Sequence, residues 1–62
     1  MALYQCLLFS AGVVDYWENL ECDSDKAALA ALIACAAYET WDVAELWLDD
    51  NLVHRLEKPK PR

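Results

Sequence analysis

Residues 23–38 read D-S-D-K-A-A-L-A-A-L-I-A-C-A-A-Y and form the longest helix-favouring segment of the chain. Alanine and leucine, the strongest helix formers, fill its interior, and neither glycine nor proline interrupts it. Ser24 or Asp23 can cap the first turn, where a short side-chain oxygen accepts from unpaired backbone N–H groups. Asp25 suits the positive end of the helix dipole. The segment therefore predicts one multi-turn α-helix.

The bulky side chains of this helix follow the spacing of a buried stripe. Leu29, Leu32 and Ile33 stand at i, i+3 and i+4, and Ala36 extends the row. We expect these residues to form one ridge against the core.

The opposite side of the helix is almost uncharged, although a helix that faces water normally has a polar back. Two interpretations remain open. Alanine serves only helix propensity there, or the small side chains let another helix or sheet approach closely. On the second interpretation the helix back is an interface that includes Ala27, Ala31, Ala34 and Cys35.

The segments on either side of the helix have the composition of strands. The expected strands are Ala2–Phe9 and Val13–Cys22 before it, and Val43–Leu48 and Leu52–Leu56 after it. The order β-β-α-β-β predicts an α+β fold, a four-stranded antiparallel sheet with the helix packed on one face. Residues 1–57 form a single domain on this interpretation, and residues 58–62 are a basic, proline-containing flexible tail.

The first hairpin is expected to turn at Ser10-Ala11-Gly12, where Gly12 can adopt a positive φ. In the first strand, Tyr4, Cys6 and Leu8 share a face without a polar member, so we expect them to point to the core. Ala44, Leu46 and Leu48 are expected to point inward from the third strand. The second strand alternates imperfectly, so either a bulge interrupts it or its outer face carries Trp17.

The register of the last hairpin depends on its loop. A three-residue loop, Asp49-Asp50-Asn51, would turn the side chains of Leu52, His54 and Leu56 inward and set Arg55 near Glu45. A two-residue loop would turn Val53 and Arg55 inward instead. Because burying Arg55 is costly, we expect the three-residue loop.

The outer face of the sheet is then expected to carry Trp17 and Trp47, with Gln5, Glu45 and Arg55 around them. Exposed tryptophans are enriched at protein interfaces. Aromatic residues also stabilise sheets through cross-strand pairs, so both interpretations of this face remain open.

Composition favours association. A chain of 62 residues buries only about 60% of the surface that its unfolded form exposes, yet 58% of these residues are hydrophobic. Residues 1–57 hold all 11 acidic residues against Lys26 and Arg55, which argues against nucleic acid as a direct partner. The longest apolar run is too short to cross a membrane. An odd number of cysteines and the lack of a signal peptide predict the cytoplasm.

The sequence offers no catalytic, cofactor-binding or metal site, and we expect no cofactor and no enzymatic activity. Cys6, Cys22, Cys35 and His54 are the residue types of a zinc site, but their spacing lacks a local ligand pair. Reduced cysteines that pack as small apolar residues are the expected alternative. No residues combine as nucleophile, base and orienting group.

Several short motifs resemble those of a group of short, uncharacterised proteobacterial proteins. They are L-Y-x-C at Leu3–Cys6, L-E-C-x-S-D-x-x-A-L-A at Leu20–Ala30, E-L-W at Glu45–Trp47 and L-V-x-R-L at Leu52–Leu56. The resemblance spans nearly the whole chain and implies a bacterial cytoplasmic protein with a ββαββ domain. It brings no catalytic residue. The chain departs from the group at residues 49–51, where many of those proteins carry glycine.

Two functions follow as expectations. The first is a small non-enzymatic protein–protein interaction module that forms a homodimer through the helix back or the tryptophan face. The second is an acidic inhibitor or accessory subunit that docks on a basic groove of a larger protein, for example a phage-type anti-defence protein that mimics nucleic acid.

Overall fold

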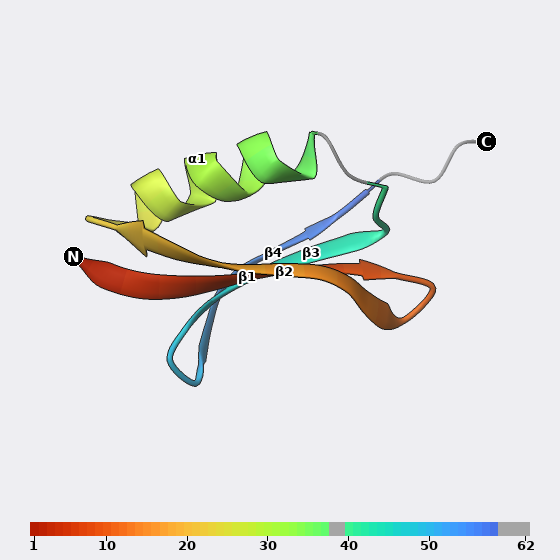
Figure 1. Ribbon diagram of the computed structural model, residues 1–62, viewed down its shortest axis with the longest axis horizontal. Coiled ribbons are helices and arrows are strands. Elements are labelled where there is room, and N and C mark those ends of the chain that lie inside the picture. Colours follow the sequence, from red (N-terminus) through yellow and green to blue (C-terminus); the bar gives the residue numbers. More distant parts are fainter. Residues whose placement is uncertain (38–39, 59–62) are drawn as a thin grey trace.

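A computed structural model describes residues 1–37 and 40–58 (Figure 1). This part of the chain forms one helix and four strands, in the predicted order: β1 (Ala2–Ser10), β2 (Val13–Cys22), α1 (Asp25–Ala36), β3 (Val43–Leu48) and β4 (Asn51–Glu57). The α+β prediction is therefore confirmed. Tyr38, the last residue of the predicted helix segment, its neighbour Glu39 and the basic tail from residue 59 onward lie outside the described residues.

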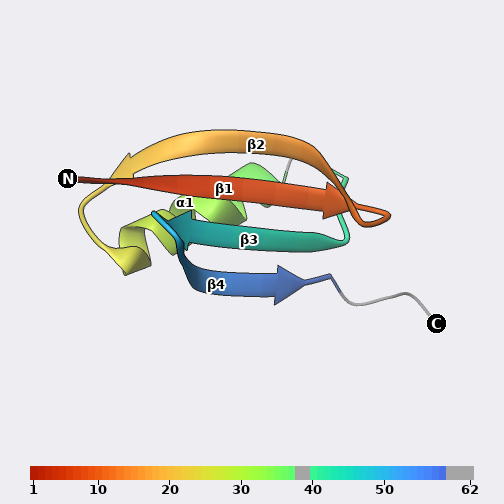
Figure 2. The ribbon, with the colours of Figure 1, turned by 90° about the horizontal axis from the view of Figure 1, so that it is seen from below.

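The strands form one antiparallel sheet in the order β2-β1-β3-β4, which the sequence left open (Figure 2). The two central strands, β1 and β3, come from different hairpins, so their pairing joins the hairpins into one sheet. The helix α1 lies across one side of the sheet, and no other described element covers the opposite side (Figure 1). The fold thus has two layers and one uncovered sheet face.

The first hairpin turns at Ala11-Gly12, where φ is 53° and 80°. Positive φ at both central positions is the pattern of the tight turns that match strand twist. The Ala11 N–H donates to Asp42 Oδ2 at 2.8 Å, which ties this turn to the start of β3. A bulge at Asp15 follows, because Leu8 pairs with Tyr16 while Phe9 pairs with Val14.

The last hairpin differs from its prediction. Asp49 and Asp50 form a two-residue turn, with Asp49 at φ 55°, and Asn51 already belongs to β4. A bulge at Val53 then shifts the register, so Leu46 pairs with His54 whereas Trp47 pairs with Leu52. The expected pairing of Arg55 with Glu45 is present.

The same bulge corrects the expected inward set of β4. Leu52 is not an inward residue: it lies opposite Trp47, on the side away from α1, and is 46% exposed. Val53 packs against the core in its place, and so does Leu56, as predicted. Because the bulge adds one residue to β4, the two-residue turn still leaves Arg55 on the outer side of the sheet. A strand whose side chains alternate without interruption cannot combine this turn with an exposed Arg55.

The core lies between α1 and the sheet. Its buried residues include the predicted Tyr4, Cys6, Leu8, Ala44 and Leu46, joined by Ala28, Leu32 and Ala36 from the helix. Leu48 packs partly buried against this core, also as predicted.

The helix stripe is rotated from its prediction. Ala28, Leu32 and Ala36 form the buried row at i, i+4 and i+8, whereas Ile33 is 54% exposed. The prediction that Ile33 faces the core is therefore wrong. The prediction chose the residues with the largest side chains as the buried stripe. In the folded chain, the small side chains of Ala28 and Ala36 let the helix backbone approach the sheet on either side of Leu32.

Both ends of α1 are anchored. Ser24 is the N-cap, and its Oγ accepts from the Ala27 N–H at 3.1 Å. The Tyr4 hydroxyl donates to Asp25 Oδ1 at 2.5 Å, which connects β1 to the first turn. At the other end the Trp41 Nε1–H donates to the Ala36 carbonyl at 2.8 Å. The bonds of Ser24 and Trp41 satisfy backbone groups that a helix leaves unpaired at its ends.

Candidate protein interaction surface

The uncovered side of the sheet, here named the outer face, carries eight apolar residues and six polar or charged ones. Residues opposite one another on neighbouring strands point to the same side, so the pairing fixes its members. They are Val14, Trp17, Asn19 and Glu21 of β2, Leu3, Gln5, Leu7 and Phe9 of β1, Val43, Glu45 and Trp47 of β3, and Leu52, Arg55 and Glu57 of β4. The predicted group of Trp17, Trp47, Gln5, Glu45 and Arg55 lies together on this face.

Several large apolar side chains of the outer face are open to solvent. The exposed fractions are 59% for Trp17, 54% for Leu3, 46% for Leu52 and 43% for Val14. None of the apolar outer-face residues belongs to the core cluster or packs against it. The outer face is thus a second apolar layer, separated from the core by the sheet itself.

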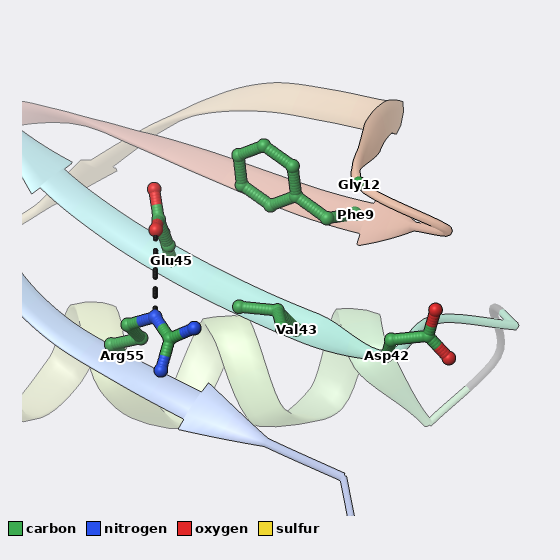
Figure 3. A pocket seen from close by; sticks show the side chains of 6 residues that line it. All are labelled: Phe9, Gly12, Asp42, Val43, Glu45 and Arg55. Atoms are coloured by element: carbon green, nitrogen blue, oxygen red, sulfur yellow. Dashed lines mark ion pairs between the residues drawn. The ribbon is translucent and has the colours of Figure 1, made fainter.

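Four side chains of the outer face bond to one another through their polar groups. Trp47 Nε1–H donates to Glu45 Oε1 at 2.9 Å, and Arg55 Nε lies 3.7 Å from Glu45 Oε2 (Figure 3). Arg55 also pairs through Nη1 with Glu57 Oε1. The Glu45 side chain is only 18% exposed, whereas that of Arg55 is 44% exposed. Glu45 therefore orients the indole of Trp47 and the guanidinium, and Arg55 remains available to solvent.

A hollow of about 180 Å³ opens beside this ion pair. Its lining comes from β1, the first turn, β3 and β4, with Phe9 and Val43 at its apolar side and Glu45 and Arg55 at its charged side (Figure 3). A second hollow of about 360 Å³ adjoins it and shares Val43 and Arg55. The outer face therefore has a depression between its two central strands and β4, with both apolar and charged side chains in its lining.

The predicted helix interface lies elsewhere. Ala27 and Ala34 of α1 are exposed, and Ala31 is half-buried. Cys35 does not belong to this surface: it packs partly buried against the core and bonds to Glu18 of β2, so its assignment to the helix back is wrong. Figure 1 shows this helix back on the opposite side of the molecule from the outer face. The eight candidate interface residues therefore cannot form one contact, because some lie on the outer face, others lie on the helix back, and Cys35 lies beneath the helix.

The polar groups beneath the helix bond internally. The Glu18 Oε2 atom accepts from the Tyr16 hydroxyl at 2.8 Å and from Cys35 Sγ at 3.9 Å. The bond to Glu18 raises the pKa of Tyr16 above its ordinary value, and the bond to Asp25 raises the pKa of Tyr4 to about 12.

All three cysteines are free thiols, and Cys6 is fully buried. Burial raises the pKa of the Cys6 thiol to about 12, with a further contribution from Cys35. A thiol with a raised pKa forms little thiolate and reacts slowly. Within the described part of the chain, no group of three or more His, Cys, Asp or Glu side chains is arranged to hold a metal ion. No helix there combines the length and apolar content that crossing a membrane requires.

Sequence reasoning missed part of the outer face. Val14 and Leu52 reach this side only because of the bulges at Asp15 and Val53, which alternation does not reveal. Leu7 and Phe9 alternate with the inward residues Cys6 and Leu8, so the sequence pattern puts them on the outer side of the strand, but they were not named as interface candidates. Two large apolar side chains on that side were the signal that could have identified them.

Comparisons with known proteins add no relative to this picture. No protein-family model, no curated protein and no solved structure matches the chain significantly.

Proposed function

We propose that this protein is a small, non-enzymatic protein–protein interaction module that acts as a homodimer. The observation that carries the proposal is the outer face, whose eight apolar residues lie apart from the core and which no described element covers. Monomers rarely expose contiguous apolar patches above a few hundred Å², and larger ones mark interaction surfaces. A second copy is the first partner to consider, because most soluble oligomers are symmetric homodimers.

The chemistry of the outer face supports binding rather than catalysis. Tryptophan and arginine are the residues that most often dominate interface energetics, and Trp17, Trp47 and Arg55 share this surface. Its carboxylate Glu45 bonds to Trp47 and Arg55, so it orients interface side chains. We place the protein in the bacterial cytoplasm as part of the same proposal, supported by the free thiols and by the motif resemblance.

The test is the solution mass, measured by light scattering on a sizing column over a concentration series with reductant present. The proposal expects a species of twice the chain mass of 7.1 kDa that dissociates on dilution. A mass of 7.1 kDa at every concentration would refute homodimerisation.

An acidic inhibitor or accessory subunit is the second candidate, and one arrangement favours it. Leu3 pairs with Glu21, and its neighbour Tyr4 pairs with Leu48 and bonds to Asp25. Five acidic residues from the end of β2, the residues that lead into α1, its first turn and the β3–β4 turn therefore lie at one end of the molecule. They are Glu21, Asp23, Asp25, Asp49 and Asp50. This end is a candidate for docking on a basic groove. Binding to a nucleic-acid-handling protein that weakens steeply with added salt would support this function, and salt-independent binding would oppose it.

A further inference from the structure

One row of paired residues crosses the outer face from β2 to β4, and the side chains at its two ends, an aromatic ring and a cation, are complementary. Leu7 pairs with Trp17 on one side and with Glu45 on the other, and Glu45 pairs with Arg55. The row therefore begins with an exposed aromatic ring on the edge strand β2 and ends with a partly exposed guanidinium on the edge strand β4.

We propose that two copies pack outer face to outer face about a twofold axis that runs along the strands between β1 and β3, setting Trp17 of each copy over the partner's Arg55. This proposal rests on the proposed homodimer and names the surface and geometry of its contact. Such an axis exchanges β2 with β4 and β1 with β3, so the two ends of the row meet twice. An arginine over a tryptophan face is a favourable cation–π contact.

The two central strands of the neighbouring row agree with this axis. Phe9 pairs with Val14 and Val43, and Val43 pairs with Glu57. The same rotation sets Phe9 over the partner's Val43, two apolar side chains that line or border the hollow. The alternative is a twofold axis perpendicular to the strands that lies over the row containing Arg55. It would stack each Arg55 on the partner's Arg55, an unfavourable contact between like charges.

The size of the outer face suits a small dimer. Its four strands are 6 to 10 residues long. With a rise of about 3.3 Å per residue and a width of about 4.8 Å per strand, the flattened face has an area of about 400–600 Å². Pairing two such faces buries on the order of 1,000 Å² in total, the lower bound for a specific interface. Face-to-face packing of twisted sheets at about 30° is a common arrangement.

Charge reversal tests the contact. Trp17→Lys sets a cation over the partner's Arg55 and should weaken dimerisation by at least about 30-fold, the effect of losing an interface hot spot. Trp17 is 59% exposed, so the substitution leaves the core intact. The matched control is Ile33→Lys on the helix back, 54% exposed, which should change the dissociation constant by less than about 3-fold.

Mixing two variants makes the test specific for the pairing. Arg55→Glu should also dimerise poorly alone, because it sets a carboxylate over the electron-rich face of Trp17. An equimolar mixture of W17K and R55E restores both contacts in a heterodimer, one as Lys–Glu and the other as Trp–Arg. Native mass spectrometry should show this heterodimer in excess over both homodimers. If R55E does not fold by circular dichroism, Arg55→Ala replaces it, with a weakening of at least about 3-fold expected.

The outcomes separate the two proposals. A monomeric wild-type chain refutes the proposed homodimer and its geometry together. A dimeric wild-type chain that tolerates W17K, dissociates with Ile33→Lys, or tightens with R55E overturns the geometry and leaves the homodimer standing. A dimer that W17K dissociates and that reforms as the mixed pair supports the geometry.

Discussion

Leu32 and Ile33 are neighbours on α1 and nearly equal in size, but only Leu32 is fully buried. Leu32→Ala should lower the free energy of unfolding by about 2–5 kcal/mol, since it removes buried methyl groups and leaves a cavity beneath the helix. The matched substitution Ile33→Ala should change it by no more than about 0.5 kcal/mol. Urea unfolding of both variants at one fixed protein concentration measures the difference. Equal losses would contradict the observed rotation of the helix stripe.

The buried thiol of Cys6 predicts a loss of stability in alkali. Its pKa rises from an ordinary 9.0 to about 12 in the folded chain, chiefly through burial, so folding favours the protonated form. The stability that the folded chain gains by keeping the Cys6 thiol protonated is fully present below about pH 9 and is lost as the pH rises through about 12. The urea midpoint should therefore fall steadily above about pH 9.

The variant Cys6→Ala is the control for this pH dependence. It should be less stable near neutrality, because it opens a small cavity, but its stability should fall less steeply above about pH 9. The pKa of Tyr4 is raised to about 12 as well, so both proteins retain a decline above about pH 10. Identical slopes for the two proteins between about pH 9 and 10 would show that Cys6 is not the titrating group.

Among the elements, the first hairpin carries strain that a substitution can relieve. Ala11 has a φ of 53°, a left-handed conformation that alanine adopts at a cost and asparagine tolerates. Ala11→Asn creates an Asn-Gly turn and should stabilise the chain by about 0.5–1 kcal/mol, as seen in the thermal midpoint. The same change at Ala30, an exposed helix position, should destabilise it because asparagine disfavours helix. Destabilisation at both positions would contradict the turn geometry.

How much of each element the sequence predicts depends on whether its period is regular. Tyr4, Cys6 and Leu8 alternate without interruption, and their inward direction was predictable. Asp15 and Val53 are extra residues at bulges, and no pattern in the side chains marks where the ladder admits them. Strand order was also out of reach, because it depends on the long-range pairing of β1 with β3.

The candidate surface was predictable in part for the same reason. Glu45 and Trp47 alternate regularly along β3, and Trp17 and Arg55 follow the bulges of their own strands in the expected phase. All four therefore meet on one face, as predicted. Leu52 was assigned to the wrong side because its position depends on the bulge at Val53. The predicted two-layer fold already separates the helix back from the outer face, and Figure 1 shows them on opposite sides of the molecule. The sequence leaves open which of the two is an interface.

At the scale of the whole molecule, net charge predicts the response of the dimer to salt. Each chain carries a formal charge of −6, so two copies repel one another at low ionic strength while the apolar contact does not depend on charge. Raising the salt from about 50 to about 500 mM should tighten dimerisation by roughly 2- to 5-fold, because it screens that repulsion. Sedimentation equilibrium measures this trend. Weakening by salt would instead favour an interface built on ion pairs.

The most direct test of the outer-face dimer is an isotope-filtered NOE experiment on a mixture of labelled and unlabelled chains, which detects contacts between subunits only. A protein of 62 residues suits this method. We expect intermolecular cross-peaks from the Trp17 ring to the Arg55 side chain and from Phe9 to Val43, and none from Ala30 or Ile33. Intermolecular cross-peaks confined to the helix back, or none at concentrations where the mass is that of a dimer and the outer-face signals are resolved, would contradict an interface on the outer face.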